Sequence, residues 1–158
     1  MSEKTKTTFV FKNIDEILDF AIKSEEAAHL FYVGWAKKLE KSHVSKFFAE
    51  LAAEELKHKK FIIGLKEGKT LQPPAGQVAD LKISDYLVDI EASQALDFQD
   101  ALTVAMHREK EAFKLYNKLA AMTADQGVKD TFLVLAQEEA KHKLRLETIY
   151  DEEILKEN

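Results

Sequence analysis

Cysteine is absent from this chain of 158 residues. Its absence excludes disulfide bonds, thiolate zinc sites, iron–sulfur clusters and cysteine nucleophiles. Proline and glycine are scarce, at two and five residues, and alanine, glutamate, lysine and aliphatic residues are abundant, a composition that favours helix almost throughout. We therefore expect an all-α protein.

The sequence also lacks an excess of positive charge and any apolar run of membrane-spanning length. The formal net charge is −5, so electrostatics favour neither nucleic acid nor an anionic membrane as a partner. The first residues lack the apolar region of a signal peptide. A cytoplasmic protein of one domain is expected, large enough to bury a core of its own.

What the chain does contain is a repeat. Shifting the sequence by 84 positions superimposes identical residues without a gap, and a fixed offset of this kind indicates two copies of one structural unit. The matching pairs include Glu25 and Glu109, Glu55 and Glu139, His58 and His142, and Tyr32 and Tyr116.

The apolar periodicity predicts two helical hairpins. Helices are expected at about 13–39, 43–66, 97–122 and 126–150, with Asn13 and Glu16 forming a capping box and a further short helix at 83–91. The single domain, 1–158, would consist of hairpin 1 at about 13–66, a crossover at about 67–96 that contains both prolines, and hairpin 2 at about 97–150. Such a long link is expected where the chain must travel the full length of a four-helix bundle.

The repeated polar residues fall on the apolar faces of these helices. Residues three apart on a helix project side by side, so each Glu-x-x-His brings an oxygen and a nitrogen to one point. Two other Glu-x-x-His pairs, Glu26 with His29 and Glu40 with His43, have no counterpart at the offset of 84 and are interpreted as chance matches. His29 is expected to pack in the core or line an access channel, and His43 and His107 to lie on the surface.

Burial of four carboxylates needs compensation, since an unpaired buried charge costs several kcal/mol. We expect no buried Arg or Lys in register to neutralise them, and two divalent cations would balance the charge. Alternatives are a bundle that has kept the residues but binds nothing, or a water-filled polar core. The flanking acids are expected to lie on solvated faces: Glu26, Glu54, Glu111 and Glu138.

Oxygen and imidazole ligands without thiolates suit iron or manganese, and zinc could also bind. Glu55 and Glu139 are the expected bridging carboxylates, Glu25 and Glu109 the terminal ones. The full set of candidate metal ligands is Glu25, Glu55, His58, Glu109, Glu139 and His142. Tyr32 and Tyr116, two turns after the terminal glutamates, are expected to hydrogen-bond to ligand carboxylates or to be plain aromatic core.

On these motifs the chain resembles the rubrerythrin branch of the ferritin-like superfamily. The matching stretches are 25–32 (EEAAHLFY), 54–58 (EELKH), 109–116 (EKEAFKLY) and 138–142 (EEAKH). The resemblance implies a ferritin-like four-helix bundle with a di-iron site, linked to peroxide reduction or oxygen-dependent iron oxidation, often in homodimers. The chain departs from the family pattern in lacking the four-cysteine rubredoxin domain and, with Met106 and Ala112 one turn either side of Glu109, an extra carboxylate.

The leading hypothesis is a di-iron oxidoreductase that reduces peroxide or oxygen and depends on an external electron-donor protein. One alternative is a ferroxidase that stores iron in a cage. Another is a non-enzymatic, metal-stabilised interaction module, in which the apolar segment 9–11 contacts a partner. A homodimer, with or without exchange of hairpins between subunits, is expected.

Overall fold

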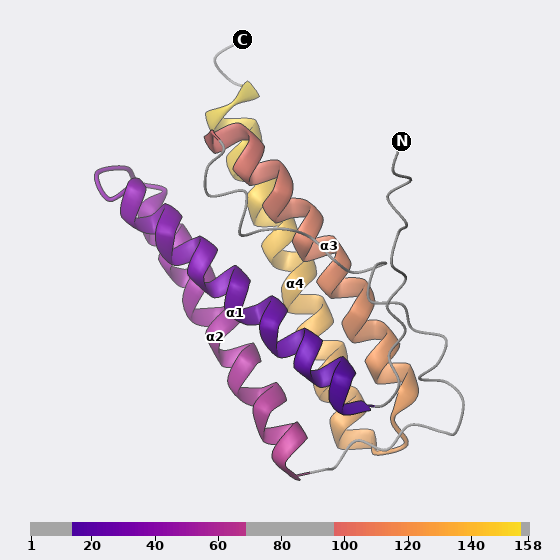
Figure 1. The fold of residues 1–158 in the computed structure, drawn as a ribbon. Helices are drawn as coiled ribbons and strands as arrows, with labels where there is room; N and C mark the ends of the chain where they lie inside the picture. Colours follow the sequence, from indigo (N-terminus) through magenta and orange to yellow (C-terminus); the bar gives the residue numbers. More distant parts are fainter. Residues whose placement is uncertain (1–13, 69–96, 156–158) are drawn as a thin grey trace, which may run out of the picture.

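The computed structural model describes residues 14–68 and 97–155. These residues form two helical hairpins that lie side by side (Figure 1). The first consists of α1 (Ile14–Lys38) and α2 (Ser45–Gly68), and the second of α3 (Phe98–Met122) and α4 (Gln126–Glu153). The partners within each hairpin are antiparallel and joined by short links at 39–44 and 123–125. The all-α prediction is confirmed, and the helix ends lie within about three residues of the predicted ones.

The order of the helices confirms the long crossover. Helices α1 and α4 run in one direction along the bundle and α2 and α3 in the other (Figure 1). Gly68, at the end of α2, therefore lies at the opposite end of the bundle from Asp97, which precedes α3. The predicted helix at 83–91, the capping residue Asn13 and the apolar segment 9–11 lie outside the described residues.

Side-chain caps set the starts of the second hairpin's helices. Asp97 accepts a hydrogen bond from the backbone N–H of Asp100 at 2.8 Å, and Asp125 accepts one from Val128 at 3.0 Å. Each cap satisfies one of the backbone donors that a helix leaves unpaired in its first turn. Capping thereby fixes the residues at which α3 and α4 begin. The start of each helix in turn sets the level along the bundle at which its inward side chains contact the first hairpin.

Two apolar clusters fill the bundle, one toward each end. The first lies around the start of α1 and the end of α3, with Leu18, Leu119 and Phe132 fully or almost fully buried. The second is richer in aromatic rings and includes Phe31, Trp35 and Phe48, with edge-to-face or tilted contacts among these rings and Phe98. Between the two clusters lies a layer of buried charged and polar side chains, so water is kept from it at both ends.

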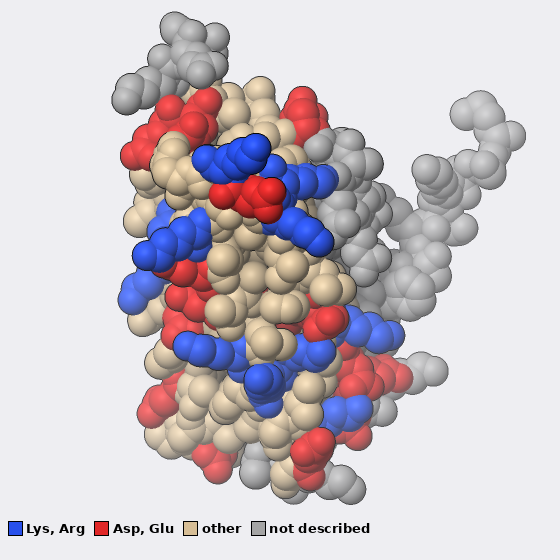
Figure 2. Space-filling model, turned by 90° about the vertical axis from the view of Figure 1, so that its left-hand side faces the viewer, with Lys and Arg blue, Asp and Glu red and all other residues tan. Residues whose placement is uncertain are grey.

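The surface carries charges of both signs. On the side of the first hairpin, basic and acidic side chains alternate with uncharged ones rather than forming a field of one sign (Figure 2). Ion pairs such as Lys59 with Glu26 and Lys66 with Asp19 link neighbouring helices there. Exposed pairs of this kind contribute little to stability. No helix of the described part is both long and apolar enough to cross a membrane.

Candidate metal centre

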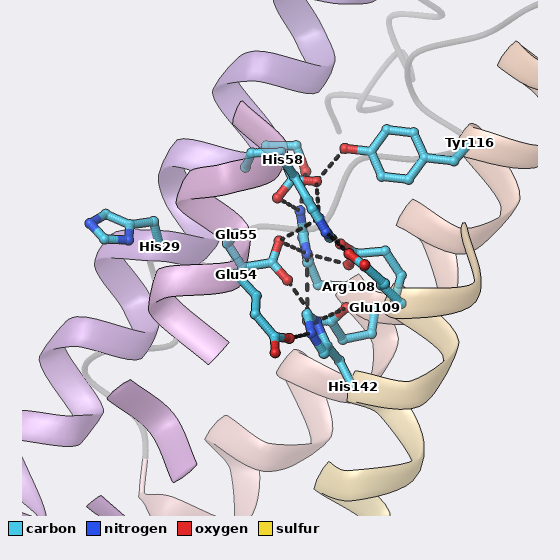
Figure 3. Close-up of polar contacts among 12 residues, drawn as sticks. His29, Glu54, Glu55, His58, Arg108, Glu109, Tyr116 and His142 are labelled. Carbon is cyan, nitrogen blue, oxygen red and sulfur yellow. Dashed lines mark hydrogen bonds and ion pairs between the residues drawn. The ribbon is translucent and has the colours of Figure 1, made fainter. Parts of the chain in front are cut away.

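The six residues that the repeat singles out come together in one buried cluster (Figure 3). Each helix contributes to it: α1 supplies Glu25, α2 supplies Glu55 and His58, α3 supplies Glu109, and α4 supplies Glu139 and His142. The four carboxylates are fully inaccessible to solvent, and the two histidines are 2% exposed. Helical spacing explains the convergence, because positions three apart project from the same face of α2 and of α4.

The cluster divides into two overlapping groups of possible ligands. One group is Glu25, Glu55, His58 and Glu139, and the other is Glu55, Glu109, Glu139 and His142. Within each group, one donor atom per residue lies within 4.8 Å of the others. Glu55 and Glu139 belong to both groups, which is the arrangement expected of carboxylates that bridge two metal ions.

Several donor atoms in the cluster have charged neighbours but no hydrogen bond of normal geometry. They are Glu25 Oε2, Glu109 Oε2, Glu139 Oε1 and His58 Nδ1. Buried polar atoms are seldom left in this state without a functional reason. Four carboxylates and two imidazoles are also a donor set that suits iron and manganese. By chemistry and by these unsatisfied atoms, the residues fit a pair of metal ions.

Each histidine presents one ring nitrogen to the cluster and the other to an outer glutamate. His58 Nδ1 lies 2.7 Å from Glu139, and its Nε2 lies 2.5 Å from Glu138. In the symmetric arrangement, His142 Nδ1 lies 2.9 Å from Glu55, and its Nε2 contacts Glu54. A proton on Nε2 that is shared with the outer glutamate leaves the lone pair of Nδ1 free for a metal.

The assignment of Glu54 and Glu138 to a solvated face is therefore incomplete. Their side chains are 39% and 43% exposed, so each spans the boundary between solvent and a buried histidine of the other hairpin. A sequence signal existed, since Glu54 and Glu138 also match at the offset of 84. Periodicity alone could not show that side chains beside the apolar face reach across to the opposite hairpin.

Both tyrosines bind a terminal glutamate across the bundle. The hydroxyl of Tyr32 donates to Glu109 Oε1 at 2.6 Å, and the hydroxyl of Tyr116 donates to Glu25 Oε1. Both rings are buried, with 0% and 1% exposure. The predicted hydrogen bonds to carboxylates are confirmed, with the addition that each tyrosine serves the glutamate of the other hairpin. These bonds fix one oxygen of each terminal carboxylate and leave the other facing the cluster.

The expectation that no buried cation neutralises the carboxylates is wrong. Arg108 on α3 is 3% exposed, and its guanidinium lies within the cluster (Figure 3). Its Nη1 donates to Glu55 and to Glu139 at 2.8 Å each and lies 3.5 Å from Glu109, while Nη2 lies 3.3 Å from Glu25. A buried positive charge is thus already present, so metal ions are not the only possible source of compensation.

Protons supply the rest of the compensation. Burial raises the pKa of Glu55 to about 8, against the attraction of Arg108 and with the help of its ionised neighbours Glu25 and Glu109. Burial and those same neighbours also raise the pKa of Glu139 well above its ordinary value. Both shared carboxylates therefore hold a proton more tightly than an ordinary glutamate does.

The terminal carboxylates behave in the opposite way. Burial opposes ionisation of Glu25, but the charge of Arg108 and hydrogen bonds from Glu55 and His58 hold its pKa well below the ordinary value. For Glu109 the same balance of burial, hydrogen bonds and Arg108 lowers the pKa to about 2. Burial acts against protonation of His58, but its contacts with Glu25, Glu55 and Glu138 raise its pKa to about 9. A metal ion that binds here would have to displace the protons held by Glu55, Glu139 and His58.

The remaining candidates lie outside the cluster. His29 Nδ1 is 2.7 Å from the carbonyl oxygen of Ala52, and Figure 3 shows its ring turned away from the carboxylates. His43 and His107 have side chains 75% and 60% exposed, which confirms their surface position. Glu111, expected on a solvated face, is 8% exposed, but it contacts Lys114 and His107 rather than the cluster.

Comparison with known proteins agrees with this architecture. The family model of Rubrerythrin matches residues 16–150. The chain belongs to the rubrerythrin family. A search of curated proteins finds no match.

Two solved structures resemble this rubrerythrin-family fold. One is a proposed ferritin-like diiron-carboxylate protein from Thermotoga maritima, with 21% identity and a TM-score of 0.71, covering 89% of this chain and 96% of that one. The other is a hypothetical protein from Pyrococcus furiosus, with 25% identity, a TM-score of 0.69 and 89% of each chain covered. The fold is therefore the ferritin-like four-helix bundle, with a buried carboxylate and histidine cluster at its centre.

Proposed function

We propose that the protein is a di-iron oxidoreductase that reduces peroxide with electrons from a separate donor protein. The observation that carries this proposal is the pair of overlapping ligand groups that share Glu55 and Glu139. In this assignment Glu55 and Glu139 would be shared by the two ions. Glu25 and His58 would complete one end, and Glu109 and His142 would complete the other.

When bound, two iron ions would supply the two electrons that convert one peroxide molecule to two waters, each ion changing by one oxidation state. The two apolar clusters on either side keep bulk water from the centre, which limits side reactions. The hydrogen bonds from Tyr32 and Tyr116 hold the terminal carboxylates in place throughout.

The outer glutamates would hold the two histidines in the orientation that metal binding needs. Glu54 and Glu138 are partly exposed and contact the Nε2 atoms of His142 and His58. A histidine whose Nδ1 would bind a metal keeps its proton on Nε2, and the outer glutamate accepts the hydrogen bond from that proton. Each hairpin thus provides one glutamate that orients a histidine of the other hairpin.

An external donor is part of the proposal because the chain has no cysteine to hold a rubredoxin-type iron of its own. The likeness to rubrerythrins supports a homodimer, and exchange of hairpins between subunits is compatible with a centre that draws ligands from both hairpins. Iron is the proposed metal. Manganese and zinc suit the same ligands.

The test is anaerobic loading of chelator-treated protein with Fe(II), followed by addition of hydrogen peroxide. Wild-type protein is expected to bind about two iron ions per chain and to develop near-ultraviolet absorption as the iron is oxidised. Glu55→Ala should lose both, since the shared ligand is removed. Glu40→Ala is the matched control, because it belongs to a Glu-x-x-His pair outside the cluster and is exposed.

Gel filtration and turnover separate the alternatives. A large multimer that oxidises Fe(II) with oxygen and retains it would replace the proposal by iron storage. Bound metal without oxidation by either peroxide or oxygen would replace it by a metal-stabilised interaction module. Absence of bound iron after loading would contradict the proposal as a whole.

A further inference from the structure

The two halves of the cluster match residue for residue, with one exception at its centre. Shifted by 84 positions, Arg108 falls on Ser24, and the two side chains lie together, with Nη2 of Arg108 3.4 Å from the hydroxyl of Ser24. The second hairpin thus places a guanidinium where the first has a hydroxyl. This charge is not accounted for by the metal ligands or by the proposed reaction.

The position of the guanidinium conflicts with the simultaneous presence of two metal ions. A single nitrogen, Nη1, lies 2.8 Å from Oε2 of Glu55 and 2.8 Å from Oε2 of Glu139. These are the two carboxylates that belong to both ligand groups. A cation that bridges them would need the space and the oxygen lone pairs that Nη1 now uses, and like charges this close repel strongly in a buried site.

The contacts of Arg108 are also incomplete. No carboxylate receives the two parallel hydrogen bonds that make an arginine pair strongest, since Nη1 is divided among Glu55, Glu139 and Glu109. The Nε–H has no hydrogen-bond partner although it is buried. Ser24 is half-buried, at the edge of the cluster, and gives Nη2 an acceptor on that side. A guanidinium so held can withdraw toward Ser24 without losing all its hydrogen bonds.

We propose that Arg108 occupies the bridging position of the metal-free centre and must be exchanged for metal when the centre loads. The inference rests on the metal centre proposed above. Arg108 then has two consequences: it allows the bundle to stay folded without metal, and it weakens metal binding by requiring that its ion pairs be broken first. Loading becomes a replacement of one cation by others rather than the filling of an empty site.

Variants at position 108 test both consequences. Arg108→Gln removes the charge and shortens the side chain but keeps a polar end, and Arg108→Ser restores the symmetry with Ser24. Both are expected to bind zinc or Fe(II) at least about tenfold more tightly than wild type and to unfold at a lower temperature when metal-free. Arg145→Gln, which alters an exposed pair with Glu50, should change neither. Equal or weaker metal binding by both variants at position 108 would overturn the inference.

A second measurement needs only the wild-type chain. The sequence has two arginines, Arg108 and Arg145, so two side-chain Nε–H signals are expected in a ¹⁵N spectrum, and Arg145→Lys assigns them. Addition of zinc, which is diamagnetic, should shift the Arg108 signal and speed its hydrogen exchange at least about tenfold as the guanidinium leaves the core. The Arg145 signal is the internal reference.

The outcomes distinguish this inference from the proposed function. Zinc bound with an unchanged Arg108 signal would overturn the exchange and leave the metal centre intact. If wild type binds no zinc, Fe(II) or Mn(II) but Arg108→Gln does, the block by Arg108 is supported and the proposed oxidoreductase fails. If neither binds metal, both proposals fail.

Discussion

The two hairpins supply matching sets of candidate metal ligands, but they differ in the charge that they place at the centre of the bundle. Each supplies a terminal glutamate, a shared glutamate, a histidine and a tyrosine, and the contacts are reciprocal: Tyr32 binds Glu109 as Tyr116 binds Glu25. Only the second hairpin supplies Arg108, opposite Ser24 of the first. The matched residues form a symmetric set of possible metal ligands. The unmatched Arg108 places a positive charge among the carboxylates of that set.

The largest effect is expected when one of the two shared carboxylates is removed, which tests whether the two hairpins contribute equally to the site. Glu139→Ala is expected to behave like Glu55→Ala, with both ions lost and peroxide-dependent oxidation reduced at least about 100-fold. The reason is that each glutamate belongs to both ligand groups. Iron analysis and stopped-flow absorbance measure the two effects. Retention of one full-affinity ion in either variant would show that these carboxylates do not bridge.

The outer glutamates test the reciprocal histidine contacts. Glu54→Gln and Glu138→Gln should each weaken metal binding by about 10- to 100-fold, because the charged acceptor that orients the histidine and increases its basicity is replaced by a neutral amide. The two variants should weaken it to a similar extent, since Glu54 faces His142 as Glu138 faces His58. Competition with a chelator gives the affinities. An effect no larger than that of Glu26→Gln would contradict the role assigned to them.

The shifted pKa values of the cluster predict how the stability of the metal-free protein depends on pH. Burial raises the pKa of Glu55 from 4.5 to about 8 when the chain folds. Folding also raises the pKa of His58 from 6.5 to about 9, because its contacts with Glu25 outweigh the opposing effect of burial. The folded state therefore binds more protons than the unfolded state across this range, and stability is lost as the pH rises toward 9. Stability is lost at the acid end too, since Glu109 has its pKa lowered to about 2.

Thermal unfolding of the chelator-treated protein between pH 4 and pH 10 measures this dependence. The greatest stability is expected at about pH 4.5, with stability falling as the pH rises from there to pH 9 and also as it drops toward the lowered pKa of Glu109. Saturating metal should flatten or reverse the slope above pH 6.5, because metal ions replace the protons. A metal-free protein that becomes more stable from pH 6.5 to pH 9 would refute the assigned protonation states.

The smallest effect is expected from the tyrosines. Tyr32→Phe and Tyr116→Phe each remove one hydrogen bond to a buried carboxylate, at a cost of about 1–3 kcal/mol of folding free energy. Because the two contacts are reciprocal, the losses should agree within about 0.5 kcal/mol. Urea unfolding of metal-free protein provides the comparison. A large difference between the variants would show that Arg108 disturbs the symmetry beyond its own contacts.

Much of this architecture was predictable because it depends on periodicity. An amphipathic helix reveals its buried face in the sequence, and a repeat doubles the signal, so Glu25, Glu55 and their counterparts could be assigned to one core. Arg108 could not, because neighbouring residues on a helix point about 100° apart, which places it beside the inward face of Glu109. A long, flexible side chain at such a position can extend either into solvent or inward.

The sequence by itself determined the four helices, the long crossover and the inventory of the centre, because apolar spacing and the offset of 84 are properties of the chain alone. Only the tertiary structure decided which carboxylate meets which tyrosine and histidine, and that Arg108 lies among all four glutamates. The reason is geometric. Helix periodicity specifies the direction in which a side chain leaves its own helix, whereas the partner of its terminal atoms depends on how the two hairpins pack against each other.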